Sequence, residues 1–195
     1  QYEAELAQAL ALVGRVHLEE PLEVRSLLPE YFVEILEGKV TPASLNVEEA
    51  LSIARKVLRP GDPLLARIEE QASKLAELRL LRALAKRLEG LGVEPEAIGK
   101  VRYGGALDLV FVEEEDVVNA VADFSKAGAI VRRLRLAPRS YALLLIYTQS
   151  AAQAVEDLKK VYGKPFPLPA WFFDKLRVVT ARIDEEEARV RRELF

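Results

Sequence analysis

The stretch Asp62-PLLARIEEQASKLAELRLLRALAKRLEG-Leu91 decides the fold of this 195-residue chain, because it reads as one uninterrupted helix. Asp62 is a favourable N-cap, Pro63 suits the first helical position, and Gly90 and Gly92 supply the stop. About 27 helical residues that rise about 1.5 Å each would extend about 40 Å, which is longer than a small domain is wide. The sequence therefore predicts a helix that acts as a strut.

A narrow apolar stripe follows this helix at three- and four-residue spacing, while charged residues fill most other positions. A second stripe with the same spacing begins after Pro169 and continues to the end of the chain. Two such stripes most simply face each other in an antiparallel coiled-coil hairpin. We predict a strut seam made by Ile68, Leu75, Leu78, Leu81, Leu88, Phe172, Leu176, Val179, Ile183 and Val190.

Between the two stripes the pattern changes to short strands and helices. Residues 106–112, 129–136 and 141–147 read as strands, and helices are predicted from Asp116 to Lys126 and after Ser150 as the N-cap. The order strand, helix, strand, strand, helix is most of a ferredoxin-like sandwich. The most apolar strand, 141–147, should be central. A final edge strand would come from residues 164–168, although their prolines are unfavourable for pairing.

The first 61 residues predict a partial α/β lobe, with helices at 2–13, 24–36 and after Asn46 and a short strand at 15–18. The expected fold class is therefore α+β. We predict an elongated protein, in which an antiparallel helical hairpin is capped by a ferredoxin-like (βαββα) distal lobe. The predicted segments are 1–61 (partial proximal lobe), 62–92 (ascending strut helix), 93–168 (distal lobe) and 169–195 (descending strut helix, truncated).

The composition excludes several classes of function. The 28 basic and 31 acidic residues give a net charge of −3, which argues against a general nucleic-acid or anionic-membrane surface. The absence of cysteine excludes disulfides and thiolate metal sites and favours an intracellular setting. The many charges without cysteine are typical of thermophilic proteins. The chain has no methionine and opens inside a helical pattern, so we expect a fragment. Its longest apolar run is shorter than the roughly 20 residues of a membrane helix, so we expect a soluble fragment.

Three sequence features that resemble chemical sites have simpler structural explanations. The glycine-rich residues 99–105 match no phosphate-binding or dinucleotide motif and predict a strained turn or bulge. His17 has no second histidine or cysteine to join it, and the acidic residues 113–116 precede a helix, where carboxylates complement the dipole. No nucleophile, base and orienting group can be assembled. We predict no catalytic, cofactor-binding or metal site, and no enzyme activity.

One feature favours a partner surface. Arg132, Arg133, Arg135 and Arg139 cluster on one predicted strand and its turn. Arginines there could bind an anion or nucleic acid, but they also protect a sheet edge or contact a protein. We expect a protein contact or a solvated face rather than nucleic acid. Trp171, Phe172 and Phe173 are predicted to begin the return helix and to pack where it joins the lobe, or to anchor a docking partner.

Two segments resemble a known family. Ala9-Leu-Ala-Leu-Val-Gly-Arg-Val-His-Leu-Glu-Glu20 resembles a first helix that runs into a G-x-V-H-L/I-E strand, and Gly105-Ala-Leu-Asp-Leu-Val-Phe and Tyr141-Ala-Leu-Leu-Leu-Ile-Tyr resemble the strands of a distal lobe. These features, and the order of parts, are similar to the cytoplasmic N-terminal region of subunit I of V/A-type rotary ATPases, the homologue of the V-ATPase a subunit.

The resemblance implies a bent rod with a proximal lobe, a helical strut and a distal lobe that meets the peripheral-stalk subunits E and G. It implies a non-catalytic stator role at the cytoplasmic face of the membrane, with the C/d protein that caps the central stalk as a further candidate partner. The family's first strand and its membrane half, with the proton half-channels, are missing from this sequence. Membrane contact would come only through that half. The alternatives are a ferredoxin-like small-molecule regulatory domain and an RNA-binding module with a coiled-coil arm.

Overall fold

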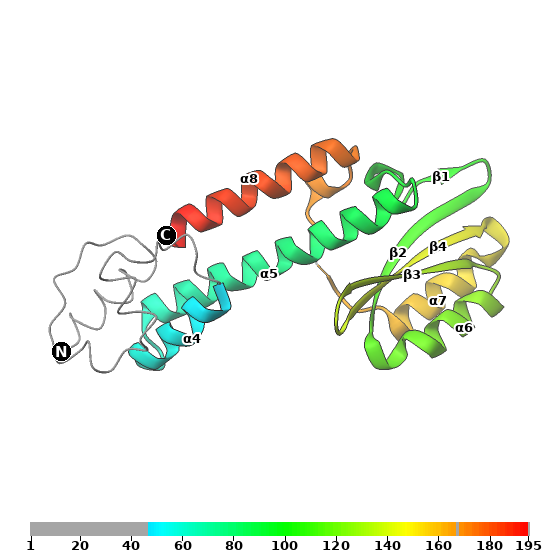
Figure 1. Ribbon diagram of the computed structural model, residues 1–195. Helices are drawn as coiled ribbons and strands as arrows, with labels where there is room; N and C mark the ends of the chain where they lie inside the picture. Colours follow the sequence, from blue (N-terminus) through cyan, green and yellow to red (C-terminus); the bar gives the residue numbers. More distant parts are fainter. Residues whose placement is uncertain (1–46, 167, 195) are drawn as a thin grey trace, which may run out of the picture. The chain divides into compact units, whose positions relative to one another are not determined.

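The computed structural model describes residues 47–166 and 168–194 (Figure 1). The described residues form five α-helices and one four-stranded antiparallel sheet, which confirms the α+β class. The contacts divide them into two compact units. One unit holds the residues up to Leu78 and those from Glu185 onward, and the other holds Arg79–Asp184. The predicted elements before residue 47, with His17 and Asn46, lie outside the described residues.

Helix α5 (Pro63–Gly90) agrees with the predicted strut helix to within one residue at each end. The Oδ1 atom of Asp62 accepts a hydrogen bond from the backbone N–H of Leu64 at 2.8 Å, as an N-cap should. Gly61 has a φ of 84° and turns the chain from α4 (Val47–Val57) into α5. Local capping signals therefore set the start of this helix.

Helix α8 (Leu176–Leu194) is the returning helix, and it packs with α5. In the Arg79–Asp184 unit the two helices are antiparallel. There, Glu94 Oε2 accepts a hydrogen bond from the N–H of Leu176 at 2.5 Å, and Arg82 donates to Asp184 at 2.5 Å. The predicted pairing of the two long helices is thus confirmed. Nine of the ten predicted seam residues are buried, and Leu176 is half-buried.

The prediction that Trp171, Phe172 and Phe173 begin the return helix is wrong. Residues Ala170–Phe172 form a separate 3₁₀ turn, and α8 starts only at Leu176. The reason is local, because Phe173 adopts φ −84° and ψ 63°, a conformation that ends the helical path. Phe172 is nevertheless fully buried.

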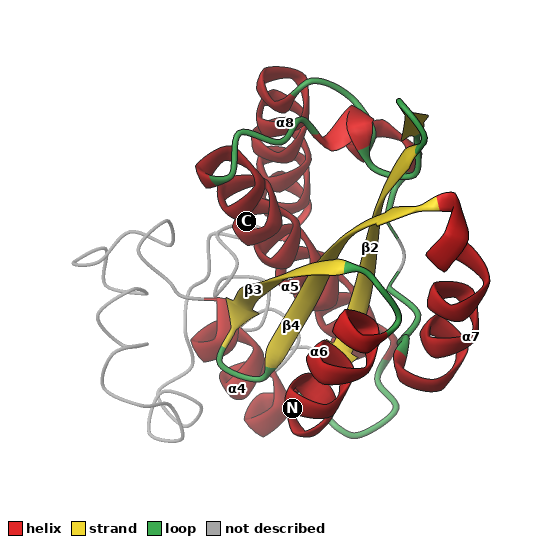
Figure 2. Cartoon of the chain, turned by 90° about the vertical axis from the view of Figure 1, so that its right-hand side faces the viewer, coloured by secondary structure: helices red, strands yellow, loops and turns green. Residues whose placement is uncertain are grey.

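In the Arg79–Asp184 unit the sheet has the strand order β1-β2-β4-β3, and all neighbours are antiparallel. The strands are β1 (Val101–Arg102), β2 (Gly105–Glu113), β3 (Ile130–Ala137) and β4 (Ser140–Thr148). Strand β4 pairs along its length with β2 and β3, so it is central as predicted. Strand β3 lies at the edge of the sheet (Figure 2).

Helices α6 (Val117–Lys126) and α7 (Ala152–Tyr162) cover one face of the sheet (Figure 2). Side chains from β2, β4 and both helices make the core there, including Val110, Leu143, Leu145, Phe124 and Val155. The order β2, α6, β3, β4, α7 matches the predicted order of strand, helix, strand, strand, helix.

The second face of the sheet is covered by the Arg79–Gly90 half of α5, on the side opposite α6 and α7 (Figures 1 and 2). Leu84 and Leu88 of α5 are fully buried, and so is Leu144 of β4. The sheet is therefore sandwiched on both faces, which explains why β4 is a continuous apolar run.

Two expectations for α7 are wrong. Its N-cap is Ala151 rather than Ser150, whose hydroxyl instead lies 2.9 Å from that of Thr148. The spacing of apolar residues after Ser150 also predicts that Ala154 and Val161 face inward, but both are exposed. The helical stripe that packs on the sheet runs through Ala151, Val155, Leu158 and Tyr162, and this spacing turns the other two side chains to solvent.

Candidate partner interface

The four predicted partner-binding arginines lie on β3 and the turn that follows it, but they do not form one cluster. Side chains alternate along a strand, so Arg132 points to one face of the sheet and Arg133 and Arg135 point to the other. The register assigns the faces. Arg133 is opposite Leu143 and Arg135 is opposite Tyr141, on the side of α6 and α7.

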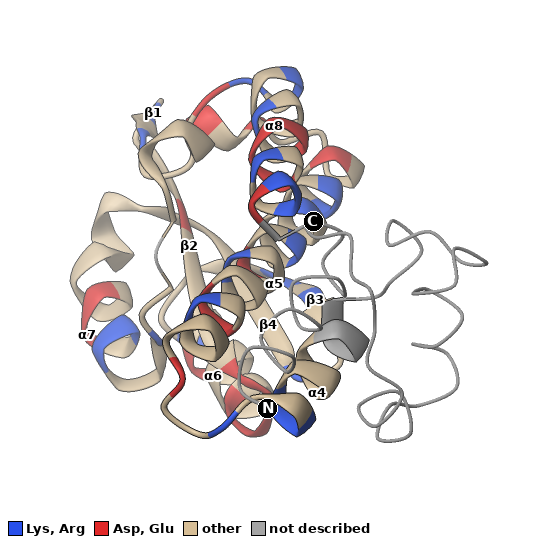
Figure 3. Ribbon diagram, turned by 90° about the vertical axis from the view of Figure 1, so that its left-hand side faces the viewer, with Lys and Arg blue, Asp and Glu red and all other residues tan. Residues whose placement is uncertain are grey.

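Arg132 lies on the α5 side, opposite Leu144. Arg139 lies in the turn between β3 and β4 and lines a cavity instead. The structure therefore brings Arg133 and Arg135 together and separates them from the other two. All four are exposed, and none makes an ion pair with another described residue. Figure 3 colours the basic residues blue and the acidic residues red along the described ribbon.

The backbone of β3 also carries polar groups at the sheet edge. The N–H of Leu107 bonds the C=O of Lys100, and its C=O accepts from the N–H of Gly99, so both groups point away from β4. The same groups of the other odd-numbered β2 residues therefore also point away from β4. The pairings of β2 with β4 and of β4 with β3 carry this alternation across the sheet. The N–H and C=O groups of Val131, Arg133 and Arg135 therefore point away from the sheet. One of them is occupied, since the C=O of Arg135 accepts from Nε of Arg87 at 3.1 Å.

The opposite edge of the sheet is covered. Of residues 164–166, predicted to begin a final strand, only Lys164 forms a bridge, in which its N–H donates to the C=O of Phe111 at 2.7 Å. Pro165 follows and has no N–H to continue the ladder. The ring of Phe166 then stacks on Phe111 with centroids 4.4 Å apart. A ring contact therefore replaces the missing backbone pairing.

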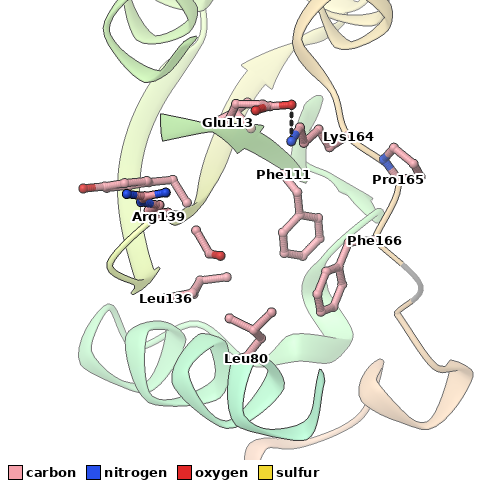
Figure 4. A pocket seen from close by; sticks show the side chains of 11 residues that line it. Leu80, Phe111, Glu113, Leu136, Arg139, Lys164, Pro165 and Phe166 are labelled. Carbon is pink, nitrogen blue, oxygen red and sulfur yellow. Dashed lines mark ion pairs between the residues drawn. The ribbon is translucent and has the colours of Figure 1, made fainter. Parts of the chain in front are cut away.

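A cavity of about 130 Å³ lies beside this stacked pair (Figure 4). Its lining includes Leu80 of α5, Phe111, Arg139 and the ion pair between Glu113 and Lys164. Binding pockets for small ligands are usually about 300–1,000 Å³, so this cavity is small for a regulatory ligand, whereas a neighbouring open hollow lined by Leu109, Lys159 and Leu168 measures about 380 Å³.

The carboxyl groups beside this cavity have opposite pKa shifts. The hydrogen bond from Lys164 lowers the pKa of Glu113 below 4.5, with a further contribution from Glu115. The hydrogen bond and the charge of Glu113 raise the pKa of Glu115. Glu113 ends β2, and Glu114–Asp116 form a 3₁₀ turn before α6, whose N-cap, Asp116, makes no side-chain capping bond. The carboxylates of Glu113 and Glu115 thus interact with each other and with Lys164, in addition to the predicted interaction of this acidic run with the helix dipole.

A second polar network joins β2 to α7. Nζ of Lys159 lies 2.6 Å from Oδ2 of Asp108, and the hydroxyl of Tyr147 lies 3.5 Å from the same oxygen. Burial, followed by the charge of Asp108, raises the pKa of Tyr147. The phenol therefore stays protonated and donates to the carboxylate. The network has no nucleophile with an adjacent base, and its geometry suits a structural tie.

Sequence reasoning missed this network and the ring pair of Phe111 and Phe166. The only signal for the first was a charged residue, Asp108, inside an apolar strand pattern. The glycine-rich residues 99–105 do form the predicted turn, because Tyr103 and Gly104 have φ values of 54° and 76° between β1 and β2. No group of three or more His, Cys, Asp or Glu that could hold a metal occurs among the described residues. No helix in the described part of the chain is long and apolar enough to span a bilayer.

The sequence matches no protein-family model and no curated protein. Among solved structures, the chain is similar to the crystal structure of the cytoplasmic N-terminal domain of subunit I, the homolog of subunit a, of V-ATPase. The TM-score is 0.37 and the sequence identity 16%, and the match covers 99% of this chain and 59% of that chain. At these values the function has to be argued from the residues of this chain.

Proposed function

We propose that this chain is a non-catalytic stator component of a V/A-type proton-translocating rotary ATPase, its cytoplasmic arm between the membrane sector and the peripheral stalks. The observation that carries the proposal is the packing of α5 with α8, with a ferredoxin-like lobe inserted between them in the sequence. The Val-His-Leu-Glu segment from Val16 to Glu19 and the two lobe strands add sequence support.

A stator has to transmit force, and the contacts of the Arg79–Asp184 unit suit that task. Leu84 and Leu88 of α5 are fully buried, so the helix is part of the lobe's core rather than a flexible tether. The hydrogen bond that Glu94 accepts from the N–H of Leu176 ties the entry of the lobe to its exit. A load on the lobe would therefore pass into both long helices.

The expected partners are the peripheral-stalk subunits E and G at the cytoplasmic face of the membrane, with the C/d protein of the central stalk as a further candidate. We place the contact on β3, where Arg133 and Arg135 are exposed without a partner charge among the described residues. An RNA-binding module is the second candidate, because the same arginines could contact phosphates.

The test is calorimetry of the chain with the purified heterodimer of stalk subunits E and G. We expect binding, and a loss of about tenfold in affinity when Arg133 and Arg135 are both changed to Glu. The matched control changes Lys100 and Arg102 to Glu, because these exposed residues lie at the opposite edge of the same sheet. Equal binding by the two double variants would overturn the assigned surface. Failure of the unchanged chain to bind, with tight binding to RNA, would overturn the stator role.

A further inference from the structure

Strand β3 is an edge strand on which the described residues occupy one outward group, the C=O of Arg135, through the side chain of Arg87. The other edge carries β1, the Lys164 bridge and the stacked ring of Phe166. On β3 the N–H and C=O groups of Val131 and Arg133, and the N–H of Arg135, point outward without a hydrogen-bond partner among the described residues. An open row of alternate donors and acceptors is a template for one more strand.

The side chains beside these groups are cationic. Arg133 and Arg135 flank the edge on the face of α6 and α7, and Arg132 flanks it on the other face. Ile130, on the same face as Arg132, has 55% of its surface exposed. A strand added here would meet three unpaired positive charges and one apolar side chain.

We propose that the β3 edge binds an acidic, extended segment of a partner polypeptide as a fifth strand of the sheet. Residues that lie opposite one another on neighbouring strands are close enough to interact, and opposite charges there are favourable. The segment would carry acidic residues at two alternate positions facing Arg133 and Arg135. On its other face it would carry an acidic residue facing Arg132 and an apolar one facing Ile130.

A second copy of this chain is disfavoured at the edge in the register centred on Arg133. Antiparallel pairing of two β3 strands centred on Arg133 would place this arginine directly opposite its copy, and like charges in that position are destabilising. The arginines therefore act against self-association and in favour of an acidic strand. Nucleic acid would use the side chains but would leave the outward backbone groups unpaired.

The inference concerns the same arginines as the stator proposal but does not depend on the identity of the partner. Its test uses a synthetic eight-residue peptide of alternating Val and Glu, added to the isotope-labelled chain and followed by NMR. We expect the amide signals of Val131 and Arg133 to shift and their hydrogen exchange to slow by about tenfold, because these N–H groups become bonded. Signals of β1 should not change.

A matched peptide separates strand addition from simple charge attraction. It has the same sequence, but the amide nitrogens of two adjacent central residues are methylated, so that both of its edges lose a donor. We expect this peptide to bind at least about tenfold more weakly at the same net charge. Equal binding by both peptides would overturn the inference, because only the charges would then matter.

Two chain variants complete the test. Changing Arg133 and Arg135 to Glu should weaken the unmodified peptide about tenfold, whereas the Lys100→Glu and Arg102→Glu control should leave its affinity unchanged. A single-stranded oligonucleotide is the last ligand to be tested against the chain. If it binds the chain and the acidic peptide does not, the edge is a nucleic-acid surface and the inference is overturned. Binding of the peptide without binding of stalk subunits would support this inference and contradict only the stator role.

Discussion

Lys159 on α7 holds its Nζ 2.6 Å from Oδ2 of Asp108 on β2, so one ion pair ties a helix to the sheet it covers. Burial lowers the pKa of Lys159, but the hydrogen bond and charge of Asp108 outweigh it and leave the pKa above 10.5. A raised pKa means that the folded state favours the ammonium more than the unfolded state does.

Removing this ammonium should destabilise the fold. We expect Lys159→Ala to lower the free energy of unfolding by about 1 kcal/mol near pH 7, a modest value because solvent reaches the pair. The stabilisation by Lys159 is fully present below pH 10.5 and is lost as the pH rises through the raised pKa that Lys159 has in the folded state. Urea denaturation of both proteins at several pH values should show the difference shrink only in strong base. Lys160→Ala, at the exposed neighbour, is the control, and an equal loss there would contradict the assignment.

The pair of Glu113 and Glu115 should titrate in two separate steps. Glu115, whose pKa is raised by the hydrogen bond and charge of Glu113, should take up its proton first as the pH falls. Glu113, whose pKa is lowered by Lys164, should remain ionised to lower pH. Any stability that Glu113 contributes is present above pH 4.5 and is lost as the pH falls through the lowered pKa that Glu113 has in the folded state.

Side-chain carbon chemical shifts followed by NMR would assign these two steps. Lys164→Ala should move the titration step of Glu113 to higher pH, because the hydrogen bond that contributes most to lowering its pKa is lost. An unchanged titration of Glu113 in that variant would show that Lys164 does not hold this carboxylate.

Two adjacent proline substitutions test the orientation of β3. The N–H of Arg132 points into the ladder with β4, whereas that of Arg133 points outward. Proline lacks this donor, so Arg132→Pro should lower the free energy of unfolding by about 1–3 kcal/mol more than Arg133→Pro. Each variant loses one exposed arginine, so the comparison isolates the backbone. The reverse order in thermal denaturation would mean that the deduced register is wrong.

The packing of α8 can be tested at two positions of the same helix. Ile183 is fully buried, whereas Val178 has 42% of its surface exposed. Truncating a buried isoleucine to alanine typically costs about 2–5 kcal/mol, so Ile183→Ala should unfold at much lower denaturant concentration than the unchanged chain. Val178→Ala should stay within about 0.5 kcal/mol. Similar midpoints for the two variants would argue against a buried seam.

The turn between β1 and β2 contains a strained residue. Tyr103 has a φ of 54° and a fully exposed side chain, so its ring gains nothing from packing. Tyr103→Asn should therefore raise the free energy of unfolding by about 1 kcal/mol, because asparagine tolerates the left-handed region better. Gly104→Ala, at a φ of 76°, should have the opposite sign. Chemical denaturation measures both changes, and a loss in Tyr103→Asn would contradict this explanation.

The elements that the sequence predicted well are those with local signals. Asp62 and Pro63 mark the start of α5, and Gly92, with a φ of 69°, turns the chain just after its last residue, Gly90, because capping and backbone conformation depend on a few neighbouring residues. The central position of β4 followed from its continuous apolar run, since a strand buried on both faces has no polar side. The start of α8 was misplaced because one residue, Phe173, leaves the helical conformation without a glycine or proline to announce it.

The candidate site depended on tertiary structure to a larger degree. Four nearby arginines suggested one patch, but strand alternation directs Arg132 and Arg133 to opposite faces, and the turn directs Arg139 into a cavity. The partners of charged residues were equally invisible, because Asp108 and Lys159 are 51 positions apart.

The sequence by itself determined most of the helices and strands in the described part of the chain and most of the apolar residues that are buried, with errors at the start of α8 and at residues 164–166. Only the tertiary structure decided which edge of the sheet remains open. Pairing of β3 with β4 leaves its outer backbone groups without a strand partner, and only the C=O of Arg135 is bonded, by Arg87. The outer edge of β2 is covered by β1, Lys164 and Phe166. The physical reason is that the strand conformation alone sets the directions in which successive N–H and C=O groups point. Which other strand they bond is decided by packing across the sheet.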